Sequence, residues 1–128
     1  MTIRSIDRIG SWCADQHAAT CDNVFGPETD VYRLSGKIFA MVNLDDAEFV
    51  TLKADPDEAL ALRQQHNFIR PGHYMNKRHW ITVDAARDVP LDLVHDLVDD
   101  SYALILASLT RAQRDALDST VTNQPPGR

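Results

Sequence analysis

The sequence VYRLSGKIFAMV at residues 31–42 decides the fold class. Two short runs rich in β-branched and aromatic residues flank Ser35-Gly36, which is typical of a β-hairpin with a tight two-residue turn. Gly36 readily takes the positive φ that such a turn requires, because it has no Cβ. Side chains alternate between the two faces of a strand. We therefore expect the second run to be covered on both faces, one formed by Ile38, Ala40 and Val42 and the other by Phe39 and Met41.

Further elements are predicted on either side of this hairpin. Residues 48–53 and 79–84 have the composition of strands, and the short polar turn at 43–46 makes the sheet antiparallel at least here. Apolar residues at helical spacing predict a helix from residue 2 to about 17. Asp55-Pro56-Asp57-Glu58 is a strong start signal for a second helix, which runs to about Gln65.

The last predicted element is a long helix over residues 91–109. We therefore expect one α+β domain at 1–118, in which N-terminal, middle and C-terminal helices pack on a single antiparallel sheet, followed by a loose tail at 119–128. The predicted core consists of Ile38, Ala40, Val42, Val50, Leu52, Ile81, Val83, Val94, Leu97, Ile105 and Leu109.

The composition agrees with one such domain. The chain has 128 residues, 44% of them hydrophobic and 25% charged, which is typical of a single globular core. Its two cysteines, Cys13 and Cys21, are too few for a disulfide scaffold and indicate a reducing compartment. No secretion leader or apolar run of about 20 residues is present, so we expect a cytoplasmic protein with no membrane contact.

The charge of the chain is unevenly distributed. Thirteen Lys and Arg against nineteen Asp and Glu give a formal net charge of −6, which argues against non-specific attraction to nucleic acid or anionic lipid. Residues 1–62 hold five basic and eleven acidic residues, and residues 80–128 hold four and eight. Between them, residues 63–79 carry four basic residues, three histidines and no acid. We call residues 63–79 the basic segment.

The basic segment has no consistent hydrophobic period between residues 66 and 77, and Arg70-Pro71-Gly72 is expected to break any regular element. We interpret residues 66–77 as a long ordered loop, and such loops often carry a function. Arg70, Lys77 and Arg78 are suited to phosphates, and the Asn76 amide to a base edge. The candidate nucleic-acid-binding residues are Arg70, His73, Tyr74, Asn76, Lys77, Arg78 and Trp80, with Tyr74 and Trp80 stacking on bases.

Other interpretations of the same residues remain open. The aromatic residues can instead anchor the loop to the core, while Lys77 and Arg78 pair with the acidic remainder of the chain. Alternatively, the histidines, aromatics and asparagine line a pocket for a planar or anionic small molecule. A purely structural or protein-interaction module is the third possibility.

Enzymatic chemistry is not indicated. The sequence contains no nucleophile elbow, phosphate-binding loop or dinucleotide-binding glycine motif, so we expect no enzyme, no catalytic residue and no cofactor. Cys13 and His17 are spaced four apart on the predicted helix, but we favour a buried cysteine beside a surface histidine over an activated thiolate. No metal site is expected from Cys13, His17 and Cys21, which lack a fourth ligand, or from the irregularly spaced histidines of the basic segment. Ser101 and Tyr102 are expected to fix the last helix against the sheet.

The stretch RPGHYMNKRHWITV at residues 70–83 resembles the signature of the MmcQ/YjbR family of small bacterial proteins. Other segments agree in the family's order, including GKIFA at 36–40, VTLKADP at 50–56, and Ser101-Tyr102 with Ile105 and Leu109. The resemblance covers about residues 2–117. One region departs from it, because relatives usually carry Pro-Gly and one or two acids where this chain has AATCD at 18–22. Any role of those acids therefore does not carry over.

This resemblance implies a CyaY-like α+β fold and a DNA-binding role, the latter through likeness to double-wing domains of phage transcription factors. Some relatives sit in antibiotic gene clusters, which makes binding or sequestration of a natural product or drug the alternative function. The expected partner is thus DNA or a small-molecule ligand, and we expect a monomer.

Overall fold

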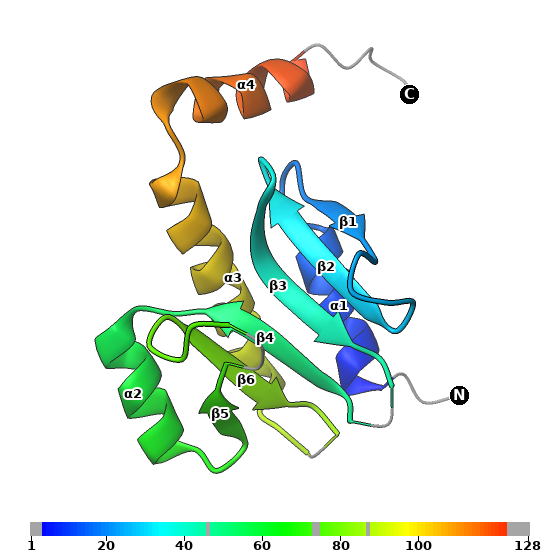
Figure 1. Ribbon diagram of the computed structural model, residues 1–128, viewed down its shortest axis with the longest axis vertical. Coiled ribbons are helices and arrows are strands. Elements are labelled where there is room, and N and C mark those ends of the chain that lie inside the picture. The colour runs from blue at the N-terminus through cyan, green and yellow to red at the C-terminus, as the bar shows by residue number, and fades with distance from the viewer. Residues whose placement is uncertain (1–3, 46, 73–74, 87, 123–128) are drawn as a thin grey trace.

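The computed structural model describes residues 4–45, 47–72, 75–86 and 88–122, with side chains described as far as residue 117. Six strands form one sheet in the order β1-β2-β3-β4-β6-β5, and all neighbouring strands are antiparallel (Figure 1). This arrangement confirms the predicted α+β class. The elements in chain order are α1 (Ser5–Ala14), β1 (Thr20–Asp22), β2 (Thr29–Leu34), β3 (Lys37–Asn43), β4 (Phe49–Lys53), α2 (Pro56–Gln65), β5 (Ile69–Pro71), β6 (Trp80–Asp84), α3 (Leu91–Ser108) and α4 (Arg111–Thr122).

The predicted hairpin is formed by β2 and β3. Its two turn residues both have positive φ, 51° at Ser35 and 81° at Gly36, as a tight two-residue turn requires. The pairing shifts by one residue between Tyr32 and Arg33. Because of this bulge, Phe39 packs in the core against Tyr102 of α3, so the prediction that Phe39 shares a face with Met41 is wrong.

The hydrophobic core lies between one face of the sheet and the helices. Ala40, Val42, Val50, Leu52 and their cross-strand neighbours are buried there, and α1 and α3 contact this face side by side, behind the sheet in Figure 1. Ala59 and Leu62 of α2 belong to the same cluster. The predicted core residues are buried with one exception, Ile38, which is half-buried opposite Arg33 at the bulge beside the hairpin turn.

Two side chains at the middle of α3 fasten it to its neighbours, as the sequence predicted. The buried Ser101 hydroxyl donates to the Phe39 carbonyl on β3 and accepts from the Lys53 amide on β4 at 2.9 Å. The Tyr102 hydroxyl donates to the His17 carbonyl at 2.8 Å, and its ring meets the Phe39 ring edge to face. These contacts fix α3 across the junction of β3 and β4.

Several boundaries differ from the prediction. The first helix ends at Ala14 rather than near 17, and the short strand β1 follows it. The segment interpreted as a loop contains β5, whose three residues are too few to show a period. The chain also forms α4, which continues to Thr122, so the first four residues of the predicted loose tail 119–128 are helical.

Candidate nucleic-acid interface

The face of the sheet opposite the helices, which we call the outer face, carries the first part of the site. Lys53 on β4 is paired with Trp80 on β6, and Arg70 on the edge strand β5 is paired with Thr82. Thr82 is paired in turn with Thr51, and the two buried hydroxyls are 3.0 Å apart. Because side chains two residues apart share a face, Lys53, Trp80 and Arg70 all belong to the outer face.

The connection from β5 to β6 is built by local contacts. The Gly72 amide donates to the Trp80 carbonyl at 2.9 Å, and a Cβ added at Gly72 would lie 2.5 Å from the Trp80 Cβ. Only glycine therefore fits this close approach. Further along, the Asn76 side-chain oxygen accepts from the Arg78 amide at 2.8 Å, which forms a local turn. This hydrogen bond occupies the amide oxygen of Asn76, the side chain that was expected to contact a base edge.

Helix α2 holds this connection from the other side. The Arg63 guanidinium, which is half-buried near the end of α2, donates to the Lys77 carbonyl at 2.9 Å. Since the contact engages the main chain, it leaves the Lys77 side chain exposed. Residues 70–72 and 75–79 of the basic segment are therefore held at the surface by contacts with α2 and β6.

The cations of the basic segment have no acidic partner among the described residues. Arg70, Lys77 and Arg78 are exposed. In the described ranges, the ion pairs are Arg4 with Asp7, Arg4 with Glu48, and Arg33 with Asp22. The alternative in which Lys77 and Arg78 pair with the acidic remainder is thus not realised within this part of the chain.

Trp80 has a different environment from the one expected. It is only 7% exposed, and the Lys53 ammonium lies 5.4 Å from its ring centroid. The ring is therefore buried as a loop anchor and cation–π partner, and it is not presented for stacking on a base. Of the other predicted residues, His73 and Tyr74 lie outside the described residues.

Lys53 is a basic side chain near this site that sequence reasoning missed. It lies in the acidic first half of the sequence, and only the β4–β6 register brings it beside Trp80. Pairing the predicted strands 48–53 and 79–84 with each other could have placed Lys53 beside Trp80.

The two cysteines and His17 lie outside the basic segment. Cys13 is completely buried, and this burial raises the pKa of its thiol to about 12. His17 is exposed and lies beyond the end of α1, while Cys21 is exposed on β1. The expected buried cysteine beside a surface histidine is therefore confirmed, and Cys13 stays protonated at neutral pH.

Acidic residues gather on the exposed surface of α3. Burial, together with the charges of Asp96 and Asp99, raises the pKa of Asp100. His95, Asp96 and Asp99 come within 4.8 Å of one another, and within the described ranges they are the one such grouping of potential metal ligands. His95 and Asp99 already have protein partners, since Trp12 packs on the His95 ring and the Gln16 amide donates to Asp99. Negative charge is thus concentrated on α3, across the sheet from Arg70.

Fold and surface together define a small α+β protein that displays a basic segment at one edge of a single antiparallel sheet. The YjbR family model matches residues 15–104, most of the chain. The chain therefore belongs to the YjbR family.

Comparison with individual proteins supports this assignment. The Escherichia coli O157:H7 protein YbdF is 41% identical over 92 residues, which cover 71% of this chain and 74% of YbdF. YjbR of Escherichia coli K12 is 38% identical over 81 residues, which cover 62% of this chain and 69% of YjbR. Both relatives are named as uncharacterized proteins. Their names therefore bring no activity to this chain.

Two crystal structures share the fold. That of Deinococcus radiodurans DR2400 has a TM-score of 0.79 and 32% identity, with 90% of this chain and 88% of DR2400 covered. A Pseudomonas syringae protein has a TM-score of 0.67 and 24% identity, with 77% and 96% covered, and this likeness concerns the fold alone. No helix in the described part of the chain has the length and apolar character that a membrane span needs.

Proposed function

We propose that this protein binds DNA without catalysing a reaction, and that the basic segment is its contact surface. The observation that carries the proposal is the exposure of Arg70, Lys77 and Arg78 with no acidic partner among the described residues. Unpaired cations on an ordered surface are available to phosphates, and each phosphate contact releases condensed counterions from the DNA.

The support for these side chains suits backbone recognition. Arg70 is on a strand, while Lys77 and Arg78 lie within the turn that Asn76 stabilises. Such positions lose less conformational freedom on binding than a mobile loop would. Lys53, held beside Trp80, adds a fourth cation on the same outer face as Arg70.

The burial of Trp80 favours contact with a duplex backbone over single-strand binding. Proteins that bind single strands usually present exposed aromatic rings to successive bases, and Trp80 is buried. The acidic surface of α3 disfavours any approach of DNA from that side, because like charges repel. DNA would therefore meet the β5–β6 edge of the sheet, and binding would be weak because of the net charge of −6.

The salt dependence of duplex binding tests this proposal. About three phosphate contacts give a slope of log affinity against log salt near −3, so affinity falls about 40- to 60-fold between 50 and 200 mM salt. Lys77→Ala should reduce the magnitude of the slope by about one, and it leaves the Arg63 contact intact because that contact uses the Lys77 carbonyl.

Arg8→Ala is the matched control, since Arg8 is an exposed cation on α1 outside the basic segment. It should leave the slope unchanged. Absence of binding at about 50 mM salt with protein in the tens of micromolar would refute the proposal, because ordinary non-specific affinity is visible there. An equal effect of Arg8→Ala and Lys77→Ala would refute the assignment of the surface.

A further inference from the structure

We propose that a second site on the outer face binds a planar aromatic cation. A cavity of about 550 Å³ lies between the β1–β2 connection and strands β3 and β4, and none of its lining residues belongs to the basic segment. This volume falls within the usual range of small-molecule sites. The alternative function predicted from the sequence placed a ligand pocket in the basic segment, whereas this cavity is elsewhere.

The base of the cavity is formed by the paired strands β3 and β4 and is partly apolar. Met41 on β3 is paired with Thr51 on β4, and Asn43 is paired with Phe49, so these four side chains share the outer face in adjacent rows. Met41 is 5% exposed, and the Thr51 hydroxyl is occupied by its contact with Thr82. A thioether and an aromatic ring on adjacent strands form a surface suited to a flat ring system.

The opposite wall carries an exposed aromatic side chain. Phe25 lines the cavity and is 62% exposed, which is unusual for phenylalanine. Its turn is ordered, because the Gly26 amide donates to the Asn23 carbonyl at 3.0 Å and the Leu44 amide donates to the Glu28 carbonyl at 2.8 Å. Phe25 is thus held at the rim, where a bound aromatic ring would cover it.

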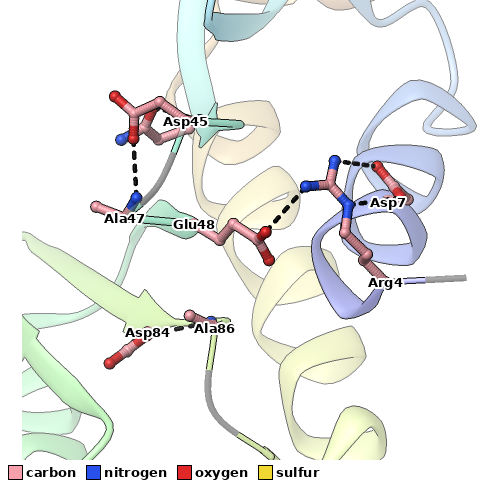
Figure 2. Close-up of polar contacts among 8 residues, drawn as sticks. Arg4, Asp7, Asp45, Ala47, Glu48, Asp84 and Ala86 are labelled. Carbon is pink, nitrogen blue, oxygen red and sulfur yellow. Dashed lines mark hydrogen bonds and ion pairs between the residues drawn. The ribbon is translucent and has the colours of Figure 1, made fainter.

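The charged residues that line the cavity favour a positively charged ligand. Among the described residues, the charged ones that line it are Glu28 and Asp45, and no described lysine or arginine lines it. Figure 2 shows the Asp45 carboxylate directed away from Arg4 and accepting from the Ala47 amide at 3.0 Å, while Glu48 faces Arg4. Asp45 and Glu28 have no ion-pair partner within the described ranges. Two unneutralised carboxylates beside an apolar floor favour a cation and repel an anion.

Methionine methyl NMR can test this site without DNA. The chain has three methionines, of which Met41 lines the cavity and Met75 lies in the basic segment. Titration of the ¹³C-methyl-labelled protein with 9-aminoacridine, a planar cation, should shift the Met41 methyl and leave the Met75 methyl in place. The planar anion 9-anthracenecarboxylate should bind at least about tenfold more weakly. No Met41 shift, or equal binding of the two compounds, would overturn the proposal.

Two variants on one turn sharpen the test. Phe25→Ala should weaken 9-aminoacridine binding about tenfold, since it removes the stacking ring. Val24→Ala is the matched control, because Val24 is 65% exposed and does not line the cavity. Both positions are exposed, so neither change should disturb the core. Unchanged 9-aminoacridine binding by Phe25→Ala would overturn the proposed site. A separate measurement of DNA duplex binding by the same variant tests the basic segment.

Discussion

Replacement of Ser101 by alanine tests how α3 is joined to the sheet. The paired residues of β3 and β4 end at Ala40 and Leu52, and Figure 1 shows the two strands diverging beyond this point. There the Ser101 hydroxyl accepts from the Lys53 amide and donates to the Phe39 carbonyl. One side chain thus satisfies two main-chain groups where the strand ladder stops.

The expected cost follows from these two contacts. Ser101 is completely buried, so alanine would leave the Lys53 amide and the Phe39 carbonyl without this partner, away from solvent. A buried polar group that loses its partner costs about 1 to 3 kcal/mol, and we expect Ser101→Ala to lower the free energy of unfolding by about 2 to 4 kcal/mol.

Urea denaturation followed by circular dichroism measures this change. The midpoint should fall while the dependence on urea concentration stays the same, because the surface exposed on unfolding is unchanged. Ser108→Ala is the control, since Ser108 is exposed and, among the described residues, its hydroxyl contacts only the Ile105 carbonyl of the same helix and the exposed Lys37 ammonium, with no buried main-chain group left without a partner. A loss below about 0.5 kcal/mol for Ser101→Ala, or an equal loss for Ser108→Ala, would refute the reasoning.

Three further predictions concern the core, a thiol and a glycine. Leu97→Ala should lower the free energy of unfolding by about 2 to 5 kcal/mol in the same assay, as a buried cavity mutation does, and an unchanged midpoint would exclude this residue from the core. Burial raises the pKa of Cys13 from 9.0 to about 12, so its contribution to stability is complete below pH 9 and declines between pH 9 and 12. Cys13→Ala should show a smaller decline, because burial also raises the pKa of Tyr32 and of Tyr102. Iodoacetamide should modify the exposed Cys21 first in the native protein, as peptide mass spectrometry can show. Gly72→Ala should cost about 1 to 3 kcal/mol, because the new Cβ would lie against Trp80; wild-type thermal stability would contradict this contact.

The parts of the fold that could be predicted are those with a strong local signal. The Ser35-Gly36 turn and its flanking runs of β-branched and aromatic residues identify the hairpin, and Asp55 caps α2 by accepting from the Asp57 amide at 3.1 Å. Strand β5 gave no such signal. It has three residues, and Pro71 at its end is tolerated because β5 is an edge strand.

The candidate site was only partly accessible to sequence reasoning. The run of cations without acids located the basic segment, but burial depends on packing across strands. Trp80 is covered because Gly72 approaches it closely and Lys53 lies over its ring, and neither contact is encoded in a local pattern. The cavity beside Phe25 likewise arises from three segments that meet only in the folded chain.

The central claim is that DNA contacts the basic segment, and methyl NMR of the wild-type protein with a DNA duplex tests it most directly. At about 50 mM salt, the account predicts that the Met75 methyl shifts on titration while the Met41 methyl stays in place, and that added salt reverses the shift. A shift of the Met41 methyl alone, or no shift of either methyl with protein and duplex in the tens of micromolar, would contradict it.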